Sequence, residues 1–174
     1  MIEIVSSNTF HNLMLPVGDK VSNNPFLDLK FLLALEDSNS IGKGTGWIAF
    51  PIIAKNNNKT VGFMPIFLKE HSYGEYVFDW AWAEAFHKHG LEYYPKMLCG
   101  IPFTPITGPR MYTEDIEVKK ILIKALEKIL KEHGISSCHI LFPDETDHKL
   151  LNKVGWLSRR GVQFKWQNKN YNTF

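Results

Sequence analysis

Four segments of the chain are predicted to be α-helical, from the helical spacing of their apolar residues or from helix start and stop signals. They are residues 25–37, a helix within the aromatic stretch 71–98 that stops at Gly90, residues 113–133, and residues 145–154. Asn24-Pro25 is typical of a helix start, because Asn can cap and Pro fits the first helical position. Thr113 can cap the third helix, and acidic side chains follow it in the first turn, where the helix dipole favours them.

Shorter apolar runs between these helices predict strands. The runs lie at residues 1–5, 47–55, 60–69, 97–104, 137–142 and 156–167, the last read as a final strand or bent pair. Asparagines at 56–58 predict a hairpin turn, since Asn tolerates positive φ. Pro51 and Pro65 lack the N–H that a ladder needs, so we expect bulges or edge positions there.

The order of these elements predicts a mixed α/β fold. A strand, a helix and an antiparallel hairpin come first, and helices alternate with strands afterwards. We therefore expect a central mixed sheet with helices on both faces. No internal repeat or linker is visible, so residues 1–174 are predicted to form one domain.

Composition narrows the class of protein. With 174 residues, 44% of them hydrophobic, and a net charge of +2, the chain is long and apolar enough to bury a core. These values exclude a disordered chain and a disulfide scaffold, and the weak positive charge gives no case for DNA binding. No signal peptide or span of about 20 apolar residues is visible, so a cytoplasmic protein is the default expectation.

Aromatic residues are concentrated between residues 71 and 94, and two carboxylates lie among them. Glu75 or Asp79, placed in an apolar pocket, would have a raised pKa and could act as a general base. The alternative is structural: each could cap a helix or pair with Arg110 or Lys96.

The same stretch supplies side chains for a substrate pocket. His71, Tyr73, Tyr76 and Trp80 are the candidates, because aromatic side chains with polar tips suit an acceptor pocket. Packing of this block as core is the alternative. The closely spaced histidines at 87 and 89 have no carboxylate or cysteine cluster nearby, so no metal site is predicted.

Six short segments resemble the signatures of one bacterial family. They read NPF (24–26), TGW (45–47), HSYGEYVFDW (71–80), YYPK (93–96), PFTPITGPR (102–110) and QFKW (163–166). The chain is similar over residues 24–174 to the FemAB-like predicted N-acyltransferases, peptidoglycan biosynthesis or recognition proteins of the GNAT acetyltransferase superfamily. The resemblance implies a GNAT-like acyltransferase fold.

The resemblance also implies an activity. The protein is expected to move an acyl or aminoacyl group from acyl-CoA or aminoacyl-tRNA onto the amine of a small molecule or cell-wall precursor. In the GNAT fold a loop and a helix N-terminus cradle the pyrophosphate of acyl-CoA, and Thr107, Gly108 and Arg110 lie in that slot. A structural turn in which Arg110 bridges to an acidic residue is the alternative.

Two departures from the family pattern bear on domain organisation. Members carry a histidine where this chain has Lys165, and they continue past the segment matching 171–174 into a second domain. We therefore expect the chain to correspond to the N-terminal half of a two-domain protein. The alternative function is a non-catalytic recognition or dimerisation domain, with a homodimer formed through the open C-terminal strand.

Overall fold

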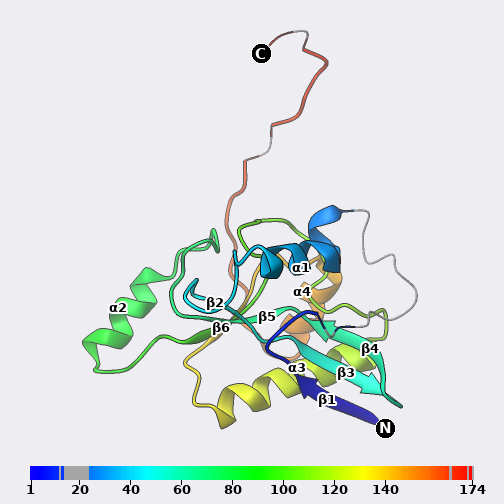
Figure 1. Cartoon of the computed structure of the whole chain (residues 1–174). Helices are drawn as coiled ribbons and strands as arrows, with labels where there is room; N and C mark the ends of the chain where they lie inside the picture. The colour runs from blue at the N-terminus through cyan, green and yellow to red at the C-terminus, as the bar shows by residue number, and fades with distance from the viewer. Residues whose placement is uncertain (12, 14–23, 165, 172, 174) are drawn as a thin grey trace.

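The computed structural model describes residues 1–11, 13, 24–164, 166–171 and 173, and it contains two sheets and four α-helices (Figure 1). Lys165, where members of the family carry a histidine, lies outside the described residues. The elements, in chain order, are β1 (Ile2–Ser6), a 3-10 turn (Pro25–Leu27), α1 (Leu29–Asp37), β2 (Trp47–Ala49), β3 (Ile52–Asn56), β4 (Lys59–Met64), β5 (Ile66–Lys69), α2 (Trp80–Lys88), β6 (Lys96–Cys99), α3 (Ile116–Glu132), β7 (Cys138–Ile140) and α4 (Glu145–Lys153).

Two prolines divide the predicted hairpin into two sheets. One sheet has the order β1-β3-β4 and the other β2-β5-β6-β7. The break between β2 and β3 falls at Pro51, and that between β4 and β5 at Pro65, because neither proline can donate to the ladder. All strand pairs are antiparallel except β6 with β7, which is parallel.

Helices cover both faces of the sheets, as the sequence predicts. Successive side chains of a strand point to opposite faces, so each strand contributes to two cores. Phe67 and Leu98 pack with residues of α1, whereas Ile66 and Met97 pack with residues of α3 and α4. Figure 1 shows α1 and α3 on opposite sides of the strands, and α2 standing apart from this layered body.

The chain leaves the sheet after β6 and returns beside the end of β7. Residues 100–107 make this excursion, and Gly108 then donates to Phe142 O at 3.1 Å and accepts from the Asp144 N–H at 2.9 Å. The chain next pairs with β4, where the Tyr112 N–H donates to Phe63 O at 2.8 Å. Only afterwards does α3 begin, capped by Asp115 rather than by the predicted Thr113.

A buried carboxylate ties this excursion to α3 and α4. Asp147 of α4 accepts hydrogen bonds from the main-chain N–H groups of Arg110 at 2.7 Å and Met111 at 3.0 Å. Its other oxygen accepts from Lys119 Nζ of α3 at 2.6 Å. Because Asp147 is fully buried, these three donors depend on it for their hydrogen bonds.

The predicted final strand over residues 156–167 is wrong. Among the described residues of this segment none is in a strand, and the chain runs in an extended path away from the body (Figure 1). The apolar residues there do not find a partner strand: Leu157 and Phe164 are almost fully exposed. The open C-terminal strand on which the predicted homodimer relied is therefore not formed.

Within the described part of the chain, no helix has both the length and the apolar character needed to cross a membrane.

Replacing Asp147 with Ala should strongly destabilise the fold. The substitution leaves the Lys119 ammonium buried without its partner and two main-chain N–H groups unsatisfied, so the free energy of unfolding should fall by about 3–5 kcal/mol. Urea denaturation of Asp147→Ala beside wild type measures this change. The matched control is Glu145→Gln on the exposed side of the same helix, which should change the curve little, and equal curves for all three proteins would contradict the assignment.

Candidate functional site

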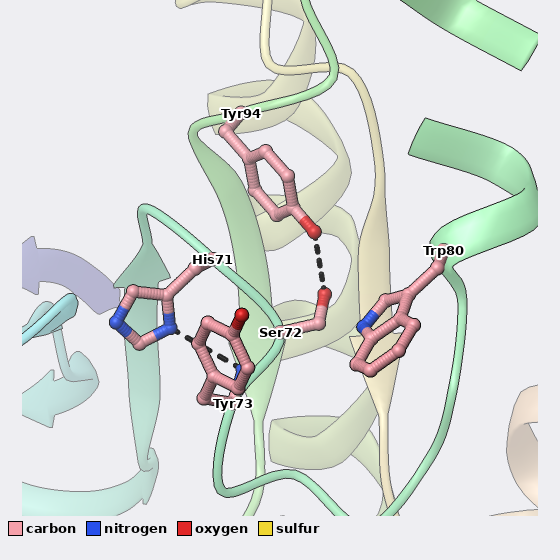
Figure 2. Close-up of a pocket in the computed structure, with 5 residues that line it drawn as sticks. All are labelled: His71, Ser72, Tyr73, Trp80 and Tyr94. Carbon is pink, nitrogen blue, oxygen red and sulfur yellow. Dashed lines mark hydrogen bonds between the residues drawn. The ribbon is translucent and has the colours of Figure 1, made fainter. Parts of the chain in front are cut away.

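An open pocket of about 270 Å³ lies where the loop after β5 meets the start of α2 and the start of β6. Figure 2 shows its lining residues, which are His71, Ser72, Tyr73, Trp80 and Tyr94. The Tyr94 ring points toward Ser72, and the rings of Tyr73 and Trp80 lie on either side of this pair. The walls are therefore aromatic, and the polar groups of Ser72 and Tyr94 meet between them.

Beside this pocket, two lysines face each other across the strands. Lys69 ends β5, Lys96 begins β6, and the two residues are directly paired in the antiparallel register. Alternation along the strands places both on the face of Phe67 and Leu98. Both side chains are fully buried, so two positive charges would lie side by side away from water. Such a pair requires negatively charged groups nearby.

Two buried carboxylates compensate the lysines. Lys96 Nζ donates to Glu75 Oε2 at 2.9 Å, to Asp79 Oδ2, and to Ser72 Oγ at 2.7 Å. Lys69 Nζ lies 4.0 Å from the other Glu75 oxygen, Oε1. One oxygen of each carboxylate, Glu75 Oε1 and Asp79 Oδ1, has no hydrogen-bond partner among the described residues. We call Lys69, Lys96, Glu75 and Asp79 the ion cluster.

Lys69 is held chiefly by main-chain oxygens and an aromatic ring. Its Nζ donates to the carbonyls of Gly46 at 3.1 Å and Tyr73 at 3.3 Å, and it lies 3.7 Å from the centre of a Trp47 ring. The ring face attracts the cation, and the two carbonyls connect β2 to the loop that carries Glu75. Lys69 therefore fixes the backbone around the ion cluster.

Two glycines let the loops approach this closely. Gly46 and Gly74 adopt positive φ values of 72° and 78°. A Cβ at Gly46 would overlap the His71 ring, and one at Gly74 would lie 2.7 Å from the Phe103 ring. Both positions therefore need a residue without a side chain.

Burial sets the protonation of the ion cluster. It lowers the pKa of Lys69 to about 7, although the charge of Glu75 acts in the opposite direction. Burial also raises the pKa of Glu75, against the hydrogen bond from Lys96. For Asp79 burial favours the neutral form as well, but hydrogen bonds from Lys96, Ser72 and Tyr93 outweigh it and lower the pKa. Glu75 is therefore the stronger base of the two carboxylates.

Tyr93 and His139 border the ion cluster on the side of β7. The Tyr93 hydroxyl donates to Asp79 Oδ2 at 2.6 Å and lies 3.3 Å from His139 Nε2. Burial, with the nearby charge of Lys96, lowers the pKa of His139 to about 4, so its imidazole is neutral at neutral pH. Glu75, Asp79 and His139 lie close enough together to hold a metal ion, but the Lys96 ammonium already bonds both carboxylates there.

Most of the residues proposed from the sequence meet at this site. His71, Tyr73 and Trp80 line the pocket, and the exposed fractions of 68% for Tyr73 and 56% for Trp80 argue against the core-packing alternative. Tyr76 does not line the pocket; it lies exposed in the turn between the two carboxylates, with a φ of 59°.

Glu75 and Asp79 lie beside the pocket but do not line it. Both pair with Lys96, as the structural alternative supposed, and in doing so they join the cluster that contacts the pocket through Ser72. Sequence reasoning named Lys96 as a possible partner but missed the others, namely Lys69, Ser72, Tyr93, Tyr94 and His139. A signal for the lysines was present: each occupies an inward position of a strand whose other residues are apolar.

The predicted anion loop is corrected by the structure. The Gly108 N–H is already used in the pairing with Phe142, and the Arg110 side chain is fully buried. The Arg110 guanidinium donates to the main-chain carbonyls of Leu141, Ile106, Gly108 and Pro109. It therefore stabilises the excursion between β6 and α3, and neither residue presents a donor to a phosphate. Thr107 is exposed in the same loop.

Comparisons with known proteins agree with this architecture. A family model described as FemAB-like, peptidoglycan biosynthesis/recognition, matches residues 1–174. Among solved structures, the aminoglycoside acetyltransferase AAC(6')-Iy in complex with the bisubstrate analogue CoA-S-monomethyl-acetylneamine aligns with a TM-score of 0.53 at 14% identity, covering 97% of this chain and 99% of that one. This likeness is one of fold, and it supports the expected GNAT-like acetyltransferase architecture.

Weaker structural matches come from two related crystals. AAC(6')-Iy in complex with CoA aligns with a TM-score of 0.45 and 15% identity over 78% of this chain and 87% of that one. An aminoglycoside acetyltransferase from an uncultured soil metagenomic sample, in complex with trehalose, aligns with a TM-score of 0.45 and 13% identity over 97% of both chains. No curated protein matches the chain.

The lowered pKa of Lys69 predicts a pH dependence of stability. Between pH 7 and 10.5 the unfolded chain carries a proton on this lysine that the folded protein has lost, so its contribution to stability rises with pH in that window. Urea denaturation at a series of pH values above 7 should therefore give a stability curve that rises less in Lys69→Met than in wild type. Lys128→Met, at an exposed lysine of α3, is the control and should follow wild type. Parallel curves for wild type and Lys69→Met would contradict the lowered pKa.

Proposed function

The chain belongs to the FemAB-like family of peptidoglycan biosynthesis/recognition proteins, and we propose that it is an N-acyltransferase whose acceptor amine binds in the pocket beside the ion cluster. One observation carries this proposal. A carboxylate with a raised pKa, Glu75, is buried beside an open aromatic pocket and is connected to it by hydrogen bonds. Amine acylation needs such a base, because the attacking nitrogen must lose a proton.

The residues of the site divide between binding and proton transfer. Tyr73 and Trp80 offer ring faces to the acceptor, and Tyr94 and Ser72 offer hydroxyl groups between those rings. The acceptor amine attacks the acyl carbonyl, the bond from the carbonyl to the leaving group breaks, and the amine proton is accepted on the side of the ion cluster. Burial keeps water from the carboxylates and so preserves the basicity of Glu75.

We propose an acyl-CoA as the donor. The solved neighbour with the same fold is a complex with a bisubstrate analogue built on CoA, which supports a thioester donor for this fold. An aminoacyl-tRNA ester is the alternative, and it would deliver its acyl group to the same amine. Because Gly108 and Arg110 are engaged within the protein, the donor phosphates are not assigned to those residues.

We propose a cell-wall precursor that carries a primary amine as the acceptor. The family description supports this class, and so does the chemistry of the pocket. Its walls are aromatic rings, which pack against the apolar faces of a sugar or peptide, and its hydroxyl groups can hold the amine.

Donor binding and transfer test the proposed activity. Calorimetry with acetyl-CoA should give a saturable heat, and acetyl transfer to D-glucosamine or to a lysine-containing cell-wall peptide should release free thiol. If transfer occurs only from aminoacyl-tRNA, the proposed donor is wrong but the proposed transferase activity is supported. Binding of the cell-wall peptide with no transfer from either donor would contradict the enzyme and favour the recognition domain.

Replacement of the base should separate chemistry from binding. Glu75→Gln keeps the size of the side chain but cannot accept a proton, so kcat should fall roughly 10²–10⁴-fold with a small change in KM for the acceptor. The matched control is Glu84→Gln, which removes an exposed carboxylate of α2 and should leave kcat unchanged. Unchanged kcat in Glu75→Gln would contradict the role of Glu75.

Removal of one wall should have the opposite kinetic signature. Trp80→Ala removes an aromatic contact worth about 1 kcal/mol, so KM for the acceptor should rise roughly fivefold while kcat stays near wild type. Trp82→Ala, two residues further along α2 and equally exposed, does not touch the pocket and serves as the control. Equal KM values in the two variants would remove Trp80 from the acceptor site.

A further inference from the structure

The base proposed above is not in contact with the pocket. Glu75 is only 3% exposed and does not belong to the pocket lining. An amine in the pocket therefore cannot give its proton to Glu75 directly, and the proton needs a path through side chains that reach both places.

Two hydroxyl groups and one ammonium make such a path. The Tyr94 hydroxyl lies 2.8 Å from Ser72 Oγ, and both residues line the pocket. Figure 2 marks this hydrogen bond with a dashed line. Ser72 Oγ accepts a hydrogen bond from Lys96 Nζ at 2.7 Å. Lys96 Nζ in turn donates to Glu75 Oε2 at 2.9 Å. Each link is short enough for a proton to pass along it.

The other pocket residues point to different partners. His71 Nε2 lies 3.2 Å from Thr45 O, and its Nδ1 accepts from the Tyr73 N–H at 3.3 Å, so both ring nitrogens face the main chain. The indole N–H of Trp80 can donate but cannot accept. The main-chain carbonyl of Tyr73 accepts from Lys69 but has no proton to pass on. Among the described residues that line the pocket, Tyr94 and Ser72 are thus the pair whose side-chain hydrogen bonds lead to the ion cluster.

We propose that Tyr94, Ser72 and Lys96 form a proton relay from the acceptor amine to Glu75. The N–H bond of the attacking amine breaks as its proton passes to Tyr94 Oη, and the phenolic proton of Tyr94 passes to Ser72 Oγ. Lys96 Nζ first gives one proton to Glu75 Oε2, and the electron pair that this leaves on Nζ then accepts the Ser72 proton. The acceptor enters as an ammonium, so the electron pair left by this proton forms the new bond to the acyl carbon. The carbon–sulfur bond then breaks, and the leaving thiolate takes a second proton from the same nitrogen.

Each member of the relay has one role. Tyr94 is the catalytic residue, because its hydroxyl touches the amine. Ser72 and Lys96 act through Tyr94, and Asp79 Oδ2 accepts hydrogen bonds from both Lys96 and the Tyr93 hydroxyl. Lys96 gives up one proton and takes up one, so its hydrogen bonds to the two carboxylates are restored after the transfer. This inference rests on the proposed function for its substrate, but the hydrogen-bonded path can be tested without any substrate.

Exchange of the Lys96 ammonium protons with water tests the path itself. The ammonium is fully buried, so its exchange should pass through Ser72 and Tyr94 at the pocket. NMR of the side-chain ¹⁵N of Lys96 in the intact chain should show exchange slowed several-fold in Tyr94→Phe. Ser72→Ala, a smaller change at the next link, should slow it as well, whereas Tyr171→Phe on the exposed C-terminal segment should match wild type. Exchange that is equally fast in Tyr94→Phe overturns the relay.

Kinetics with acetyl-CoA and D-glucosamine tests its use in the reaction. Tyr94→Phe should lower kcat about 10²-fold with little change in KM, and the effect should shrink as pH rises and more of the amine is already deprotonated. A merely structural role for Tyr94 would lower kcat equally at every pH. If Tyr94→Phe slows proton exchange at Lys96 but the protein transfers acetyl to no acceptor, the hydrogen-bonded path is supported and the proposed transferase activity is wrong. If transfer occurs but the effect of Tyr94→Phe on kcat does not depend on pH, the transferase activity is supported and the relay is wrong.

Discussion

The structure of the site depends on two lysines that face each other on the buried side of neighbouring strands. Lys69 and Lys96 are direct partners in the register of β5 and β6, and both are fully buried. Two like charges in this position would oppose folding, so the loop that follows β5 must return over them with Glu75 and Asp79. The pocket is built from the residues that precede and follow these carboxylates, and its place is therefore fixed by the pairing of the charges.

The sheet supplies the rigidity that this arrangement needs. Pro51 and Pro65 divide the long hairpin, so that β5 can pair with β6 while β4 pairs with β3. The parallel pair of β6 and β7 brings His139 to the ion cluster, and the excursion before α3 is held by Arg110 and Asp147. The ion cluster lies at the end of β6 that borders the pocket, and the network of Arg110 and Asp147 lies beyond the other end. These two buried polar networks keep β6 in place.

Much of the fold could be predicted from the sequence, because it follows from local patterns. The helices, the hairpin and the interruptions at Pro51 and Pro65 depend on periodicity and on the missing proline N–H groups. The final strand was predicted wrongly because residues 156–164 are apolar enough for a strand but have no neighbour to pair with. The expectation that the chain is half of a longer protein, and that the protein is cytoplasmic, stays a prediction.

The candidate site was predicted less completely, since it depends on which side chains meet. The aromatic stretch indicated the pocket walls and both carboxylates, but the pairing of Lys69 with Lys96 follows from strand register, which no local pattern contains. Arg110 was predicted to bind a phosphate because arginine side chains commonly do so. Its burial among main-chain carbonyls depends instead on the path of residues 100–107 between β6 and α3. Tyr94 was overlooked because only the fold places its hydroxyl against Ser72.

The proposed activity requires that Glu75 keeps its basicity while buried beside the pocket. A ¹³C NMR titration of the Glu75 carboxyl carbon in the intact chain measures this most directly. We expect a midpoint above 4.5, the ordinary value for this group, because burial disfavours the charged carboxylate more than Lys96 favours it. A midpoint at or below 4.5 would mean that the ion cluster is a purely structural ion pair, and it would contradict the role assigned to Glu75.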